Sequence, residues 1–300
     1  MVFPGMWFLS EANGLALAWS GGPRECALTV ADSLTNDLLF CPRAQRISVS
    51  IGGMTTKTRG TAVITGASSG IGAATAIRLS KEGFHVVLGA RRIDKLEEVA
   101  AASDGRALPL DVTDEASVRA FAEAIDDVDV LVNNAGLASG LQPFDELEED
   151  RVQLILQTNV MGLLRTTLAL LSKLEAGDGG HIVNVGSIAG FEVYPGGGGY
   201  TASKHAVRAI SRTMRIDLLG RPIRITEISP GMVETEFSTV RFDGDSDKAA
   251  KVYEGMKPLT GDDVAECIAW ALTRPRHVDI DEIVVRPIAQ ATATMVARES

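Results

Sequence analysis

The sequence predicts an α/β protein built on a doubly wound, seven-stranded parallel sheet. From residue 61 onward, short apolar runs of strand length alternate with longer amphipathic stretches of helical period. A glycine-rich turn, Gly66 to Gly72, joins the first run directly to the first amphipathic stretch. Strands that alternate with helices in this way form a parallel sheet covered on both faces, and we expect one such domain over residues 54–300.

Composition narrows the class of protein. The chain has 300 residues, a net charge of −10 and 45% hydrophobic residues, which suits a soluble globular domain with a sizeable core. We expect no nucleic-acid partner, because the chain has no basic run. The cysteines (Cys26, Cys41, Cys267) and the scattered histidines form neither a disulfide framework nor a metal-ligand spacing, so we expect no metal and a reducing cytoplasm.

Residues 1–53 differ from the rest of the chain. They contain MWFL and LALAW, but the apolar runs are too short to span a membrane and no positive segment precedes them. They show no clear helical or strand period. At Met54 the character of the sequence changes abruptly, beginning with MTTKTRG. Our hypothesis is that Met54 is the functional start and that 1–53 is an upstream extension; the alternative is a genuine but poorly ordered tail.

The first strand and its glycine turn predict a phosphate-binding site. The run at 61–65 (TAVIT) reads as a buried strand, and GASSGIG at Gly66–Gly72 opens the following helix. Glycines allow the backbone to approach a pyrophosphate, and the helix N-terminus adds N–H donors. The spacing is G-x-x-x-G-x-G, and a purely structural loop is the alternative.

The end of the second strand concerns the choice of dinucleotide. The run at 85–88 is followed by GARR, in which Ala90 stands where an acidic residue would hold a ribose 2′-hydroxyl. Arg91 and Arg92 suit a 2′-phosphate, which favours NADP over NAD. The alternative is that they begin the solvated face of the next helix.

The third and fourth strands, at 107–110 and 129–132, also end in polar residues. Asp111 follows the third strand, where an adenine would lie, and Asp114 caps a helix that runs to residue 125. The fourth strand runs into NNAG, Asn133 to Gly136. These residues form either a plain turn or a cross-link of the sheet that faces a cofactor.

A long apolar helix is expected from residue 149 to about 173, with Asn159 in its middle. A buried asparagine needs partners, because its amide competes with the helix hydrogen bonds. Asn159 is therefore either a satisfied core amide or an active-site group that interrupts the helix.

A serine, a tyrosine and a lysine follow the fifth strand, at 181–185. Ser187 lies just past the strand end, and Tyr200 and Lys204 share one face of a helix running to about residue 219. A free tyrosine has a pKa of about 10, and we expect the Lys204 ammonium to lower that of Tyr200. Tyr253 and Lys257 repeat the spacing, but Gly255 and Pro258 assign them to a surface loop.

The last part of the chain completes the sheet. A sixth strand at 223–228 leads to a Pro230-Gly231 turn and Thr235, where the nicotinamide end of a cofactor would lie. Residues 237–259 are polar and irregular, and form either a substrate lid or plain surface. A helix at 262–272 and a seventh strand at 282–285 follow.

Taken together, these motifs resemble the short-chain dehydrogenase/reductase family. The matches cover nearly all of 59–300 and are TGASSGIG (Thr65–Gly72), Asp111-Val112, NNAG, Asn159, Ser187, Tyr200-x-x-x-Lys204 and Pro230-Gly231 with Thr235. Within the family, GARR, TEFSTVRFDGD and DEIVVRPIAQ are similar to bacterial NADP-dependent 3-hydroxy acid (serine or allo-threonine) dehydrogenases.

The resemblance implies a Rossmann fold, a homotetramer and a direct hydride transfer. Tyr200 would be the acid or base, Ser187 would orient the substrate oxygen, Lys204 would hold the nicotinamide ribose, and Asn159 would hold a relay water. The residues implied for NADP(H) binding are Gly66, Ser68, Ser69, Gly70, Ile71, Gly72, Arg91, Arg92, Asp111, Val112, Asn133, Asn134, Ala135, Gly136, Tyr200, Lys204, Pro230, Gly231, Val233 and Thr235.

The substrate is less constrained by the sequence. A 3-hydroxy acid needs a cation for its carboxylate, and Arg241 is the candidate, with plain solvated charge as the alternative. The competing functions are a reductase of a bulkier ketone or aldehyde and a non-catalytic nucleotide-binding protein on the same fold.

Overall fold

A computed structural model describes residues 16–20, 27–31 and 59–299, and the chain divides into two units, 1–56 and 57–300. In the first unit, β1 (Ala16–Ser20) pairs antiparallel with β2 (Ala27–Ala31). The sequence showed no strand period here, so that expectation is wrong for these ten residues. The hypothesis of a start at Met54, and the order of the remaining extension, fall outside the described residues.

The second unit contains the predicted seven-stranded sheet, in the order β5-β4-β3-β6-β7-β8-β9, with every pair parallel. The central strands are buried on both faces, which explains their continuous apolar text. The strands are β3 (Thr61–Thr65), β4 (His85–Ala90), β5 (Arg106–Pro109), β6 (Val130–Asn133), β7 (Gly180–Val185), β8 (Ile223–Pro230) and β9 (Glu282–Val285).

The chain reverses its direction across the sheet between β3 and β6. It adds β4 and β5 on one side of β3 and then returns to place β6, β7, β8 and β9 on the other side. Ligands of open parallel sheets bind at such a switch point, outside the carboxyl ends of the strands. The topology therefore places the segments after β3 and β6 at the mouth of a crevice.

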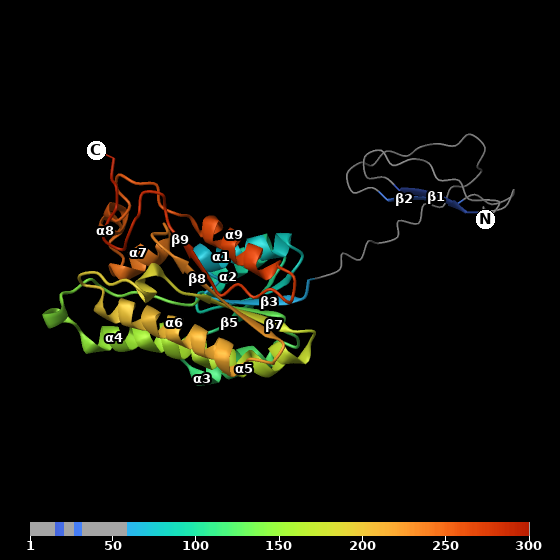
Figure 1. The fold of residues 1–300 in the computed structure, drawn as a ribbon, viewed down its shortest axis with the longest axis horizontal. Helices are drawn as coiled ribbons and strands as arrows, with labels where there is room; N and C mark the ends of the chain where they lie inside the picture. Colours follow the sequence, from blue (N-terminus) through green and yellow to red (C-terminus); the bar gives the residue numbers. More distant parts are fainter. Residues whose placement is uncertain (1–15, 21–26, 32–58, 300) are drawn as a thin grey trace. The chain divides into compact units, whose positions relative to one another are not determined.

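Helices cover both faces of the sheet (Figure 1). On one face, α1 (Gly70–Lys81), α2 (Ile93–Ala102) and α9 (Gly261–Leu272) pack over a core that includes Leu79, Leu96 and Ile268. On the other, α3 (Glu115–Glu123), α5 (Gly162–Ala176) and α6 (Gly198–Asp217) cover a second core that includes Phe121 and Leu170. Each helix thus buries one apolar stripe against the sheet.

The long apolar helix is interrupted in the middle. It consists of α4 (Glu149–Leu156), a π-helical turn η2 (Gln157–Met161) and α5, and Asn159 lies in the π turn. A π turn inside an α-helix often marks a functional site. By length and composition the stretch Glu149–Ala176 could cross a membrane, but core helices of soluble proteins share these properties, and α5 packs here on β6, β7 and α3.

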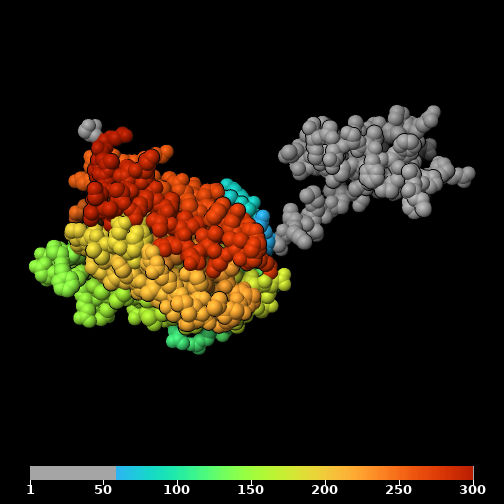
Figure 2. All heavy atoms as spheres, in the orientation of Figure 1, coloured from blue at the N-terminus to red at the C-terminus, as the bar shows by residue number. Residues whose placement is uncertain are grey.

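The segment after β8 is more regular than its polar text indicates. It forms two short helices, α7 (Glu236–Arg241) and α8 (Ser246–Lys251), capped by Thr235 and Asp245. The expectation of an irregular segment is therefore wrong. The C-terminal segment, red in Figure 2, folds back onto this region, where the Glu299 amide donates to the carbonyl oxygen of Gly255.

Candidate active site

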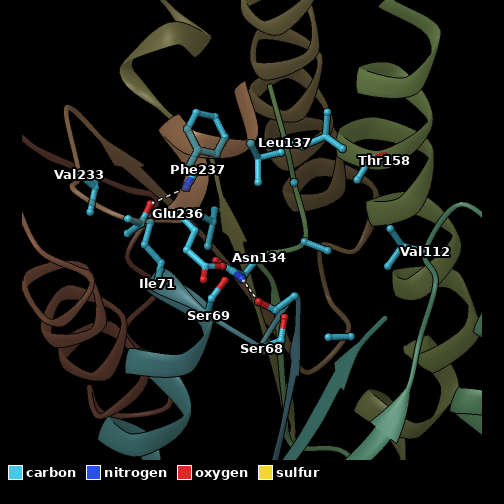
Figure 3. A pocket seen from close by; sticks show the side chains of 18 of the residues that line it. Ser68, Ser69, Ile71, Val112, Asn134, Leu137, Thr158, Val233, Glu236 and Phe237 are labelled. Atoms are coloured by element: carbon cyan, nitrogen blue, oxygen red, sulfur yellow. Dashed lines mark hydrogen bonds between the residues drawn. The ribbon is translucent and has the colours of Figure 1, made fainter. Parts of the chain in front are cut away.

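A cleft of about 360 Å³ opens at the carboxyl ends of the central strands (Figure 3). It collects residues that the sequence places far apart, from the turn after β3, the ends of β4, β6 and β7, and helices α6 and α7. The sequence-predicted residues that line it are Gly66, Ser68, Ser69, Gly70, Ile71, Arg91, Arg92, Asp111, Val112, Asn134, Ala135, Gly136, Ser187, Tyr200, Lys204, Pro230, Gly231, Val233 and Thr235.

The glycine turn depends on glycine for its backbone shape. Gly66 and Gly70 have φ of +66° and +56°, in the left-handed region that disfavours other residues. Gly72 lies behind the cleft, and a Cβ there would come within 2.5 Å of both the Gly66 carbonyl oxygen and the Asn134 side chain. The turn and the start of α1 line the cleft through Ser68, Ser69, Gly70 and Ile71, and a helix N-terminus in this position suits a pyrophosphate.

The two adjacent asparagines after β6 have different tasks. The Asn134 amide donates to the carbonyl oxygens of Thr65 and Gly66, at 2.9 and 3.1 Å, and so fixes the glycine turn. Asn133 points into the core and donates to Thr167 and to Asn184 of β7, each at 2.9 Å. Asn133 cross-links the sheet but does not line the cleft, so its expected place beside a cofactor is not where the structure puts it.

A cluster of charge surrounds the end of β4. The Arg92 guanidinium donates to the hydroxyls of Ser68 and Ser69, at 3.1 and 2.6 Å, and forms an ion pair with Glu236. Asp111 follows β5 and accepts hydrogen bonds from Thr113. Burial opposes its ionisation, but these bonds and the positive charge of Arg91 outweigh burial and lower the pKa of Asp111.

Ser187, Tyr200 and Lys204 converge on the opposite side of the cleft. Ser187 lies past the end of β7, and its hydroxyl donates to the carbonyl oxygen of Pro230 at 3.4 Å and accepts from the amide of Ala189. Tyr200 and Lys204 are one turn apart on α6, with the Lys204 Nζ 5.8 Å from the centre of the Tyr200 ring. The same Nζ donates to the carbonyl oxygen of Val185 at 2.7 Å.

The charge states of these groups differ from the sequence-based expectation. Burial raises the pKa of Tyr200 above its ordinary value, opposed by the positive charge of Arg241 and by Ser187, so the expected lowering by Lys204 is not found. Burial lowers the pKa of Lys204 to about 8, and the buried Glu227 carboxylate partly offsets this effect. The structure thus favours a protonated Tyr200 hydroxyl at neutral pH.

The side chain of Asn159 makes three hydrogen bonds within the protein. Its Oδ1 accepts from the Leu137 amide at 2.8 Å, and its Nδ2 donates to the Leu137 carbonyl oxygen and to the Ser203 hydroxyl at 2.9 and 3.0 Å. The amide therefore joins the segment after β6 to α6, as a satisfied core amide would. Asn159 nonetheless interrupts the helix as the active-site alternative required, since it lies in η2, one residue after Thr158 of the cleft lining.

Arg241 faces the catalytic candidates and not open solvent. Its guanidinium lies 5.1 Å from the centre of the Tyr200 ring and 5.4 Å from that of Phe237, and it donates to the Tyr194 hydroxyl at 2.7 Å. The Phe237 ring meets the Tyr200 ring edge-on, with 5.5 Å between centroids. Arg241 does not belong to the cleft lining, but it places a positive charge beside Tyr200.

The second Tyr-x-x-x-Lys pair stands apart from the site. Tyr253 lies in the turn after α8 and is half-buried; its hydroxyl donates to the carbonyl oxygen of Val233 at 2.7 Å and contacts Ser238 at 2.6 Å. The predicted loop position outside the site is confirmed, but Tyr253 is half-buried there and its hydrogen bonds hold the segment after β8 in place.

Several residues of the site escaped the sequence analysis. Glu236, Phe237 and Val240 come from α7, Leu137 and Thr158 from the loop and helix that follow β6. Glu236 and Phe237 directly follow Thr235, and this adjacency was the available signal. Among residues 16–20, 27–31 and 59–299, no group of three or more histidine, cysteine, aspartate or glutamate residues is arranged to hold a metal ion.

The sequence of the chain is similar to those of known proteins. The sequence profile of the short chain dehydrogenase family matches residues 60–245. An uncharacterised oxidoreductase of Mycobacterium tuberculosis is 56% identical over 233 residues, 78% of this chain and 93% of that protein. An NADP-dependent 3-hydroxy acid dehydrogenase of Schizosaccharomyces pombe is 42% identical over 250 residues, 80% of this chain and 96% of that protein.

The fold is also similar to that of a solved structure. The closed form of a serine dehydrogenase complexed with NADP⁺ superposes with a TM-score of 0.76 at 36% sequence identity. It covers 80% of this chain, and all of that chain is matched. The similarity therefore extends over most of this chain.

Proposed function

This chain belongs to the short-chain dehydrogenase family, and from that premise we propose that it transfers a hydride between NADP(H) and a small 3-hydroxy acid or related alcohol. The proposal rests on one observation: the cleft is lined both by Ser187, Tyr200 and Lys204 and by the glycine turn with Arg91 and Arg92. The relatives that act on 3-hydroxy acids and on serine support this substrate class. A cytoplasmic location, consistent with the absence of a disulfide framework in the sequence, is part of the proposal.

The residues of the cleft fit NADP(H). The positive-φ turn at Gly66 and Gly70 and the start of α1 would hold the pyrophosphate, and Arg91 and Arg92 would hold the 2′-phosphate. Asp111 and Val112 would border the adenine, and Pro230, Gly231, Val233 and Thr235 the nicotinamide end. When bound, the nicotinamide would donate or accept the hydride.

Tyr200 would move the proton of the reaction. Its raised pKa keeps the hydroxyl protonated, which suits an acid that protonates the carbonyl oxygen during reduction. Ser187 would hold the same oxygen by a second hydrogen bond and stabilise its developing charge. In the oxidation direction the Lys204 ammonium and Arg241 would stabilise the phenolate that must accept the proton.

Asn159 would support this site through position. Its side chain holds Leu137, at the cleft, to the helix that carries Tyr200. Asn159 would also hold a water that relays protons between Lys204 and solvent. The Asn159 Oδ1 accepts one hydrogen bond, from the Leu137 amide, and its second lone pair would accept one from such a water.

Arg241 is the proposed partner of the substrate carboxylate. Its guanidinium already lies near the Tyr200 ring, and Tyr194 holds it by one hydrogen bond. A carboxylate bound there would leave the carbinol carbon close to Tyr200. The apolar neighbours Phe237 and Val240 would exclude water from the reacting atoms.

The proposal is tested by a substrate panel in which the reduced cofactor is followed by absorbance. Serine, 3-hydroxypropionate and 3-hydroxybutyrate are compared with neutral alcohols in the presence of NADP⁺, and bulky ketones with NADPH. Higher kcat/KM for the 3-hydroxy acids supports the proposal. Higher kcat/KM for bulky ketones would replace it with the alternative reductase, and no turnover of any substrate with cofactor still bound would favour a non-catalytic nucleotide-binding protein.

We also propose a homotetramer. Large apolar side chains are exposed on the helices that cover one face of the sheet, among them Leu154, Leu168 and Ile216, which are 44, 69 and 73% exposed. Association would remove this surface from water. Light scattering coupled to size-exclusion chromatography measures the mass directly, and a monomer at micromolar concentration would contradict the tetramer.

A further inference from the structure

We propose that Glu236 is an internal competitor for the 2′-phosphate site, whose carboxylate pairs with the cations of that site until the 2′-phosphate of NADP(H) displaces it. This inference rests on the proposed function, because it assumes that Arg92 belongs to the 2′-phosphate site. It adds a specificity-determining residue on α7 and a second cation, Lys95 of α2, to the residues that decide between NADP(H) and NAD(H).

The proposal rests on the two ion pairs that Glu236 forms, one with Arg92 and one with Lys95. One oxygen of Glu236 lies 2.7 Å from Arg92, and the other lies 2.6 Å from Lys95. The same Arg92 guanidinium also holds Ser68 and Ser69 of the glycine turn. Figure 3 shows the Glu236 side chain in the cleft beside Ser69. The carboxylate thus lies among the donors that a 2′-phosphate would use.

The charge of Glu236 makes it a suitable substitute for a phosphate. Hydrogen bonds from Lys95 and Arg92 lower the pKa of Glu236 to about 2, so the side chain is ionised at neutral pH. A carboxylate and a phosphate compete for the same guanidinium and ammonium donors. A dianionic phosphate brings more charge than the carboxylate and can displace it, whereas a ribose 2′-hydroxyl cannot.

Displacement of the Glu236 carboxylate would also affect the other end of the cleft, because Glu236 lies on the same helix as residues there. Glu236 is the first residue of α7, which also carries Phe237 and Arg241. Those two residues contact Tyr200 and Tyr194. The ion pairs hold the start of α7 against α2, and displacement of the carboxylate by the 2′-phosphate would break them.

The inference is tested by calorimetric titration with adenosine 2′,5′-bisphosphate and with AMP, which lacks the 2′-phosphate. Glu236→Gln keeps the side-chain size and removes the charge. Exposed ion pairs contribute little each, so two of them predict a gain of about three- to tenfold in bisphosphate affinity, with AMP affinity unchanged. Glu234→Gln is the matched control: it is two residues away and exposed, and the described ion pairs of Arg92 and Lys95 do not include it.

A second measurement separates competition from simple repulsion. If Glu236 acts by pairing with Arg92, its removal in an Arg92→Gln background gains clearly less affinity for the bisphosphate than in the wild type. An undiminished gain in that background would mean that the carboxylate repels the phosphate directly, and would overturn the proposal. Circular dichroism of each variant checks that the fold is retained.

The remaining outcomes distinguish this inference from the proposed function. If the wild type prefers the bisphosphate but Glu236→Gln binds it no more tightly, the competition is refuted and the NADP assignment stands. If neither protein distinguishes the two probes, both are refuted. A gain that is equal for AMP and the bisphosphate also overturns the competition, because it would not depend on the 2′-phosphate.

Discussion

Lys204 donates a hydrogen bond from its Nζ to the carbonyl oxygen of Val185, 2.7 Å away. Val185 ends β7, and Ser187 follows two residues later, so this bond fixes the helix of Tyr200 against the strand that supplies the serine. The ammonium lies beside the Tyr200 ring and is itself almost completely buried, with 6% of its residue surface exposed. This backbone contact thus helps to set the relative positions of the three side chains.

The first prediction concerns Tyr200→Phe. The phenyl ring keeps its edge-on contact with Phe237, so the fold is retained while the ionisable hydroxyl is lost. A positioned acid or base contributes about 10²–10⁴-fold to the rate, and we expect kcat to fall by that factor. Initial rates with NADPH or NADP⁺ measure it, and near-normal turnover would remove Tyr200 from the mechanism.

Tyr253→Phe is the matched change in the second Tyr-x-x-x-Lys pair. It removes hydrogen bonds to Val233 and Ser238 but no group near Tyr200, so any loss of turnover should stay within about tenfold. Equal losses in the two variants would show that the hydroxyls serve only the packing of the site.

The second prediction is a pH dependence of stability caused by Lys204. Its pKa in the folded protein is about 8, against a reference value of 10.5. Between these values the unfolded chain binds a proton that the folded protein does not, so the free energy of unfolding rises with pH across this window. Below pH 8 the buried ammonium costs stability, and the full difference is about 3 kcal/mol.

Comparison of the cofactor-free wild type with Lys204→Met isolates this effect. Urea unfolding at pH 7 and pH 10 should show the wild type gaining stability relative to the methionine variant as pH rises. The same difference between the two proteins at both pH values would contradict the lowered pKa.

The third prediction tests the 2′-phosphate site with Arg91→Ala combined with Arg92→Ala. Charge-assisted hydrogen bonds contribute about 1.5–3 kcal/mol each, so kcat/KM with NADPH should fall by at least tenfold. NADH has no 2′-phosphate, and its kcat/KM should change much less. Steady-state kinetics with both cofactors decide the question, because equal losses would refute the assignment.

Much of the site could be predicted because its residues follow strands or lie one helical turn apart. The sheet fixes where Ser187 and Asn134 emerge, and the i, i+4 spacing places Tyr200 with Lys204. The sequence cannot distinguish Asn133 from Asn134, since that depends on which residue ends β6. The residues next to Asn133 in the sequence do not reveal that it faces Asn184 across the sheet.

Long-range pairing accounts for the other misses. The Arg92–Glu236 pair joins residues 144 positions apart, and no local pattern marks it. The raised pKa of Tyr200 has the same origin: burial raises it and Arg241 and Ser187 oppose the rise, and all three effects arise from tertiary packing that the nearby Lys204 does not reveal. Most residues of the site can therefore be identified from the sequence, whereas their pKa values depend on contacts that only the fold creates.

The fourth prediction concerns Arg241→Gln. If Arg241 binds the substrate carboxylate, the change should raise KM for a 3-hydroxy acid by about tenfold or more, with a smaller effect on a neutral alcohol of similar size. Arg119→Gln, on the exposed surface of α3, is the control and should leave both values near those of the wild type. An equal rise for both substrates would assign Arg241 to the packing of Tyr194 and Tyr200 only.

The fifth prediction concerns the turn that supports the cleft. Gly72 lies inside α1, where alanine would be favoured by up to about 1 kcal/mol on helix propensity alone. The added Cβ, however, would come within 2.5 Å of the Gly66 carbonyl oxygen, which is backbone and cannot rotate away. Overpacking costs about 1–3 kcal/mol, so Gly72→Ala should lower the free energy of unfolding and weaken NADPH binding together.

Gly198→Ala separates this clash from a general effect of glycine replacement. Gly198 begins α6, and a Cβ there meets only the end of the Leu147 side chain, at 3.3 Å. Because that side chain can rotate, we expect the stability of Gly198→Ala to stay within about 0.5 kcal/mol of the wild type. Urea unfolding measures both variants. If Gly72→Ala proves as stable as Gly198→Ala, α1 can shift away from the glycine turn, and the turn does not require a glycine at position 72.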